Sequence, residues 1–159
     1  MNSKKAVTLI TLTVTVVILA VLTASVIINV ENIFPEAKKA KFAEDLKKVE
    51  DGIREYYLTY GHYPVDSATA YTKSEVVALN TSSRGELLSD EIDKNGDKES
   101  EFYLVDLDKI RVTAITYGNV VSEDDIFVAA TLTGNVYYVK GIVQDGTARF
   151  SLRSYEMQK

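Results

Sequence analysis

Residues 7–30 read VTLITLTVTVVILAVLTASVIINV, a run of 24 residues without a charged side chain. As a helix with a rise of about 1.5 Å per residue, the run would be roughly 36 Å long, which is enough to cross the hydrocarbon core of a bilayer. Only Met1–Ala6 precede it, and Lys4 and Lys5 in this leader favour a cytoplasmic N-terminus. The sequence therefore predicts a single-pass membrane protein whose remaining residues lie outside the cytoplasm.

Two other interpretations of the apolar run stay open. A secretory signal peptide would be cleaved near Thr23-Ala24-Ser25, and a permanent signal anchor would not be cleaved at all. The length of the run weighs against the signal peptide, because the apolar core of such a peptide is only about 7 to 15 residues long.

The composition of the chain argues against several functions for the part that follows the apolar run. The 159 residues leave room for one modest domain beside a membrane segment. A net charge of -5 argues against non-specific nucleic-acid binding, and the tyrosines at residues 56–63 do not alternate with basic residues as a binder of single strands would need. There is no cysteine, no Gly-x-Ser-x-Gly elbow and no phosphate-binding glycine loop. We therefore expect neither an enzyme nor a nucleic-acid partner.

The pattern after Pro35 predicts an amphipathic helix over residues 36–60. Pro35 either kinks the chain or begins a new helix, because it cannot donate an i to i-4 hydrogen bond. Gly61 and Pro64 are expected to end this helix, Gly61 by adopting a left-handed conformation. Apolar residues recur along the segment at intervals of three and four, as in a helix that packs on a core: Phe42, Leu46, Val49, Ile53, Tyr56 and Tyr60.

Two motifs resemble those of type IV pilins and type II secretion pseudopilins. Lys4-Lys5-Ala6-Val7-Thr8-Leu9-Ile10 is similar to the prepilin signature. Gly61, His62, Tyr63 and Pro64 are similar to the Gly-x-Tyr-Pro turn that closes the long helix of pseudopilins. The two motifs bracket residues 4 to 64, about two fifths of the chain.

The resemblance implies processing and assembly. A prepilin peptidase would cut between Ala6 and Val7, leaving an N-methylated Val7, although the family prefers Gly before the cut and Phe after it. The mature chain would join copies of itself and other pilin-like subunits in a filament built by an assembly motor. Thr11 stands where most members place a Glu that pairs with a neighbouring subunit.

Three threonines on the apolar run are candidates for an assembly surface. Thr8, Thr11 and Thr15 are three and four residues apart, so they share one face of a helix, where small polar residues let helices approach and hydrogen-bond. The alternative, that each hydroxyl bonds only its own i-4 carbonyl, stays open.

The C-terminal part of the chain reads as an antiparallel sheet. Gly134-Asn135 and Asp145-Gly146 supply the positive backbone angles of tight hairpins. Residues 65–101 read as a variable connecting loop with helical candidates at Ser74–Leu79 and Gly85–Ile92. Runs rich in β-branched and aromatic residues predict five strands: Phe102–Leu107, Ile110–Tyr117, Ile126–Thr133, Val136–Val143 and Thr147–Leu152.

The expected fold class is therefore α+β, with a long N-terminal helix packed against a small antiparallel sheet. The apolar half of that helix would lie in the membrane and its amphipathic half on the sheet. The expected divisions are a leader at residues 1–6, a transmembrane and polymerisation helix at 7–34, and a soluble head at 35–159 whose sheet covers 102–153.

One polar loop is a candidate for cation binding. Asp93, Asn95, Asp97 and Glu99 place oxygen side chains at alternate positions, as a loop does when it wraps Ca²⁺. The run is not an EF-hand, since Gly96 stands at its fourth position rather than its sixth. The alternative is a plain surface turn, because Asn95-Gly96 is also a strong turn signal.

Three function classes follow from these patterns. The first is a structural subunit of a pilus-like filament, held in the cell membrane before assembly and exposed at the cell surface afterwards. The second is a membrane-anchored surface binding module, cation-binding or not, that does not polymerise. A third, weaker alternative is an anchored hydrolase.

Overall fold

The computed structural model describes residues 14, 36–64, 70–120, 122–144 and 146–156. The chain divides into two units, Met1–Lys38 and Lys39–Lys159. Apart from the first residues of the helix over residues 36–60, the elements below belong to the second unit.

The expected fold class needs correcting at its N-terminal helix. The first helix with described bounds begins at residue 36, and no helix in the described part of the chain is long and apolar enough to span a bilayer. The predicted helix over 7–34 lies, Val14 excepted, outside the described residues.

Four antiparallel strands form one sheet in the order β1-β2-β3-β4. Phe102 pairs with Ala130, Phe127 with Tyr138, and Ile142 with Arg149. The strands are β1 Phe102–Leu104, β2 Phe127–Ala130, β3 Val136–Gln144 and β4 Thr147–Ser151.

The strand predicted at Ile110–Tyr117 is wrong. This stretch consists of turns and bends, and Arg111 and Ala114 have positive φ angles of 53° and 58°, which an extended strand does not contain. The apolar residues that suggested a strand, among them Val112 and Ile115, pack against the core individually instead. These side chains can be buried without the segment pairing with a neighbouring β-strand.

Short helices flank the sheet. The helices predicted at 74–79 and 85–92 are confirmed as α2 (Lys73–Leu79) and α3 (Gly85–Lys94), and a third, α4 (Leu152–Glu156), follows β4. Thr72 caps α2 through a capping box with Glu75, which satisfies two of the free N–H groups at the helix start. Residues 70–101 are therefore more structured than the variable loop expected from the sequence.

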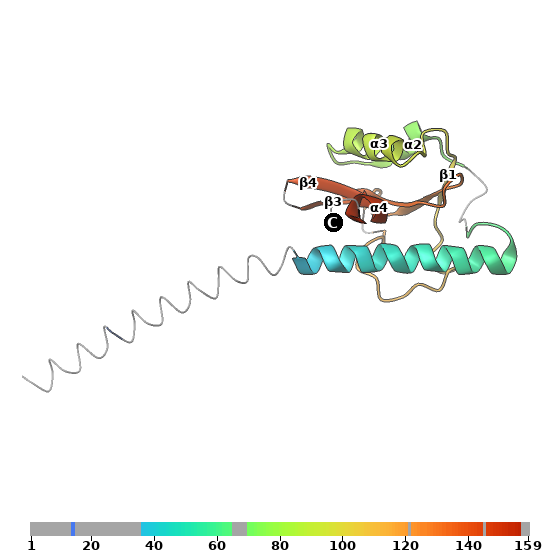
Figure 1. The fold of residues 1–159 in the computed structure, drawn as a ribbon, viewed down its shortest axis with the longest axis horizontal. Helices are drawn as coiled ribbons and strands as arrows, with labels where there is room; N and C mark the ends of the chain where they lie inside the picture. The colour runs from blue at the N-terminus through green and yellow to red at the C-terminus, as the bar shows by residue number, and fades with distance from the viewer. Residues whose placement is uncertain (1–13, 15–35, 65–69, 121, 145, 157–159) are drawn as a thin grey trace, which may run out of the picture. The chain divides into compact units, whose positions relative to one another are not determined.

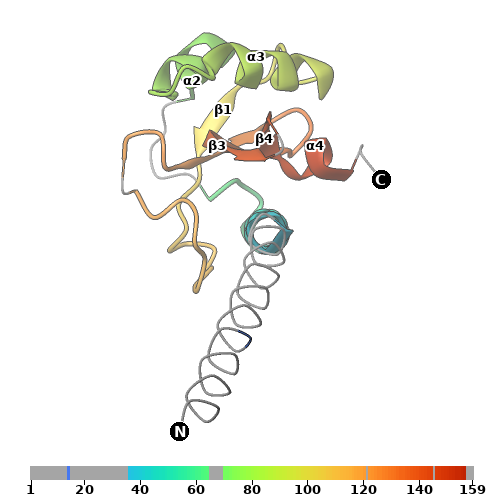
Figure 2. The same ribbon diagram turned by 90° about the vertical axis from the view of Figure 1, so that its left-hand side faces the viewer.

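The folded unit has three layers, with the sheet between the long helix on one side and α2 and α3 on the other (Figures 1 and 2). Side chains along β2 alternate between the two sides: Phe127 and Ala129 join the cluster under the long helix, and Val128 and Ala130 join the cluster under α2 and α3. All four residues of this strand are buried, so both faces of the sheet are covered.

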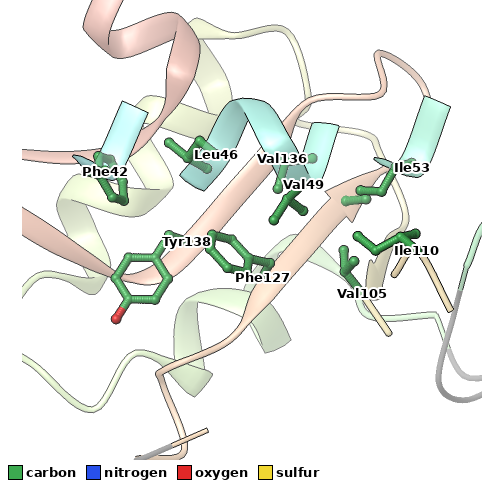
Figure 3. Packing of buried hydrophobic residues seen from close by; sticks show 10 residues of the cluster. Phe42, Leu46, Val49, Ile53, Val105, Ile110, Phe127, Val136 and Tyr138 are labelled. Atoms are coloured by element: carbon green, nitrogen blue, oxygen red, sulfur yellow. The ribbon is translucent and has the colours of Figure 1, made fainter. Parts of the chain in front are cut away.

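The long helix contributes one row of side chains to the first cluster (Figure 3). Phe42, Leu46, Val49 and Ile53 are at most 4% exposed, and each such side chain contributes about 1.5 to 3 kcal/mol by leaving water. The row of apolar residues predicted from Phe42 to Tyr60 does not stay buried to the end of the helix, because Tyr60 is 59% exposed. The last turn of the helix therefore presents aromatic side chains to solvent.

Candidate functional site

Several predicted site residues lie outside the described residues. These are the processing pair Ala6 and Val7 and the assembly threonines Thr8, Thr11 and Thr15. Their roles stay predictions from the sequence.

The four residues of the predicted cation loop have different partners. Asp93, near the end of α3, binds the Nζ of Lys73 through Oδ1 at 2.5 Å. The Nδ2 of Asn95 donates to the Oγ of Ser151 at 3.2 Å. Glu99 is exposed. The loop thus connects α3 to α2 and to β4.

Asp97 is fully buried and receives hydrogen bonds from four side chains. The Tyr137 hydroxyl donates at 2.7 Å, Ser100 and Thr133 each donate a hydroxyl at 2.8 Å, and the Asn135 amide donates at 2.8 Å. Burial raises the pKa of Tyr137, and the bond to Asp97 raises it further. This carboxylate therefore fastens the loop before β1 to the β2–β3 turn.

Among the residues that the structure describes, no group of three or more His, Cys, Asp or Glu side chains is placed to hold a metal ion. A cation at Asp97 would have to displace neutral donors that already satisfy both carboxylate oxygens. A calcium titration can decide between the two alternatives for this loop, a cation site and a plain surface turn.

A buried carboxylate on the long helix was missed in the sequence. Asp45 is fully buried and accepts hydrogen bonds from the backbone N–H of Thr116 at 2.6 Å and of Tyr117 at 3.3 Å. Lys41 lies 2.9 Å from its other oxygen, and this hydrogen bond raises the pKa of Lys41. The sequence did contain a signal for this burial, because Asp45 lies three residues after the apolar Phe42 and therefore on the same face of the helix.

Asp124 and Asp125 lie near the end of the irregular stretch between β1 and β2, and Asp125 holds this stretch by hydrogen bonds. The Oδ1 of Asp125 accepts from the backbone N–H of Gly118 and from the hydroxyl of Tyr138, both at 2.8 Å. Burial alone would raise the pKa of Asp124, but hydrogen bonds from the hydroxyls of Ser122 and Thr81 lower it below its ordinary value. Carboxylates from the helix and from the segment itself thus hold the irregular stretch between β1 and β2.

The end of the long helix gathers five aromatic side chains. The helix ends at residue 60, and Gly61, with a φ of 75°, donates its N–H to the Tyr57 carbonyl at 2.8 Å, as in a left-handed cap. The Tyr56 and Tyr60 rings are 4.5 Å apart between centroids. His62 lies edge-on to Tyr56 at 5.4 Å, and Tyr63 lies 5.1 Å from Tyr57.

A groove of ≈ 330 Å³ opens beside Tyr56 and Tyr60. Its opposite wall is the stretch of Lys109, Ile110 and Arg111. Ile110 approaches the helix closely, because a Cβ on Gly52 would lie only 3.1 Å from the Cβ of Ile110. The small residue at position 52 therefore allows this stretch to place two cations beside the tyrosines.

The sequence did not reveal this groove, since its two walls are more than 45 residues apart along the chain. The buried carboxylates hold loops in place, whereas the groove is open to solvent. Comparison with protein-family models, with curated proteins and with solved structures found no match.

Proposed function

We propose that the protein is a structural subunit of a type IV pilus-like or pseudopilus-like filament. Prepilin peptidase removes residues 1–6. The apolar segment 7–34 holds the chain in the cell membrane and afterwards makes the contacts between subunits. The head lies outside the cytoplasm, and an assembly motor builds the filament from this chain and other pilin-like subunits.

The order of features along the chain carries this proposal. An uncharged run begins directly after Lys4 and Lys5, and an amphipathic helix ending at Gly61 follows it. One face of that helix packs into the first core cluster, so the head has a hydrophobic core that does not include the apolar run. A non-closing contact between identical chains produces an open filament, which suits a subunit whose apolar segment is separate from its folded head.

A block at the cleavage position tests the proposal. Ala6→Arg should prevent processing when the chain is expressed with a prepilin peptidase, because a long charged side chain replaces a methyl group next to the scissile bond. Ser3→Arg, which adds the same charge within the leader, is the matched control and should be processed normally. Intact mass reports processing, and electron microscopy of sheared cell surfaces reports filaments. Normal processing of Ala6→Arg, or a wild-type chain that forms no filaments, would exclude the proposal.

The second candidate is a membrane-anchored binding module that does not polymerise. The open groove between the helix end and Arg111 favours it, as does the absence of a Glu at position 11. An unprocessed chain that stays in the membrane fraction without filaments would support this candidate over the first.

A further inference from the structure

The groove at the end of the long helix combines rings and charges in a pattern that points to a ligand. Tyr60 is 59% exposed, although an aromatic side chain with an available core is usually buried. The rings of Tyr56, Tyr60 and His62 contact one another at tilted or edge-on angles. Lys109 and Arg111 line the same groove as Tyr56 and Tyr60. The protein thus keeps both an aromatic surface and two cations in contact with solvent.

The cationic wall is held in place. The Oδ1 of Asp106 accepts from the backbone N–H groups of Asp108 and Lys109 at 3.0 and 3.2 Å, which fixes the turn that leads into Arg111. Arg111 has a positive φ of 53°, a conformation that costs a non-glycine residue free energy and that gathers at functional sites.

The groove's charge limits the kind of anion it can take. Lys109 and Arg111 contribute two positive charges and Glu55 one negative charge, and Lys109 also lies 3.3 Å from a carboxylate oxygen of Asp106. The whole chain carries a net charge of -5, which repels a strand with one phosphate per nucleotide. The groove therefore suits a ligand with an occasional carboxylate rather than a polyphosphate.

The aromatic wall defines the rest of the ligand. A sugar ring has a C–H face that packs on an aromatic ring and a rim of hydroxyls that needs polar partners, here the Glu55 carboxylate and the tyrosine hydroxyls. The volume of ≈ 330 Å³ is that of a small binding site, which takes one or two rings. We propose that this groove binds an acidic polysaccharide, one uronic-acid unit at a time, with the ring on Tyr60 and the carboxylate on Arg111.

Calorimetric titration of the full chain in detergent micelles tests the site. The probes are a hyaluronan tetrasaccharide, which carries a carboxylate on every second sugar, the neutral maltotetraose and a thymidine tetranucleotide. The hyaluronan tetrasaccharide should bind, and Tyr60→Ala should weaken its binding about tenfold through the lost ring contact. Arg111→Asn should weaken it about tenfold or more through the lost charge-assisted hydrogen bond, while Asn tolerates the left-handed backbone.

The matched controls are Tyr57→Ala and Arg54→Asn. Both replace exposed side chains on the same helix that do not line the groove, and they should leave the affinity within about twofold, as a change at a separate surface does. Far-ultraviolet circular dichroism confirms that each variant is folded. No binding of the hyaluronan tetrasaccharide at about 5 mM, equal binding of maltotetraose, tighter binding of the tetranucleotide, or equal losses in the controls would each overturn the proposal. None of these outcomes depends on processing or filament formation.

Discussion

Asp97→Ala should be among the most damaging single substitutions in the head. The Tyr137 hydroxyl and the Ser100 hydroxyl are buried and would lose their acceptor, whereas Thr133 and Asn135 can turn to water. A buried donor without a partner costs about 1–3 kcal/mol, so two such donors cost about 2–6 kcal/mol. That is a large part of the roughly 5–15 kcal/mol by which a domain is stable.

Urea unfolding of residues 36–159, followed by circular dichroism, measures this loss. Glu99→Ala, two residues further on and exposed, is the control and should change the free energy of unfolding by less than about 0.5 kcal/mol. Adding Tyr137→Phe to Asp97→Ala removes one stranded donor, so the double variant should be more stable than the sum of the single losses predicts. A loss below about 1 kcal/mol for Asp97→Ala, or strict additivity in the double variant, would show that the network does not hold the loop.

Three further predictions concern the core, a buried acid and calcium. Ile53→Ala should lower the free energy of unfolding by about 2–5 kcal/mol, because Ile53 is only 4% exposed in the core of the head. Thr11→Ala is the control and should leave the stability of the head unchanged in urea titrations. Equal effects of the two substitutions would contradict a head that folds separately from the apolar run. Burial raises the pKa of Glu91 despite its hydrogen bond from Ser151, so ionisation of this carboxyl favours the unfolded state. The stability of the head should therefore fall as pH rises above the unfolded pKa of Glu91, near 4.5. Glu91→Gln should flatten this decline in melting curves, and an unchanged slope would contradict the role of Glu91. Millimolar Ca²⁺ should leave the melting temperature of residues 36–159 unchanged, because the oxygens of Asp97 already have protein donors, and an upward shift would establish a cation site.

Local sequence signals located some elements well. Gly61 marks the end of the helix over residues 36–60, because glycine tolerates a positive φ. The helical candidate at residues 85–92 located α3 to within two residues. What the pattern did not show is that α2 and α3 cover the second face of the sheet, since periodicity gives the apolar face of a helix but not its partner.

Non-local contacts account for the errors. Ile110 and Val112 have the composition of a strand, yet they pack singly beside Gly52, and nothing in the sequence connects those positions. Apart from Lys41 and Ser100, which are near in the sequence, the partners of Asp45 and Asp97 are backbone and side-chain groups between 36 and 72 residues away. The sequence showed acidic residues but not which of them would be buried.

The N-terminus of the protein purified from its own membranes tests the proposed function most directly. Intact mass together with N-terminal sequencing should give a chain that begins at methylated Val7. Removal of Lys4 and Lys5 takes the 18 basic residues to 16 against 23 acidic ones, so the net charge should change from -5 to -7, which isoelectric focusing can detect. A chain that begins at Met1, or one cleaved near Ala24, would contradict processing by a prepilin peptidase and with it assembly into a pilus-like filament.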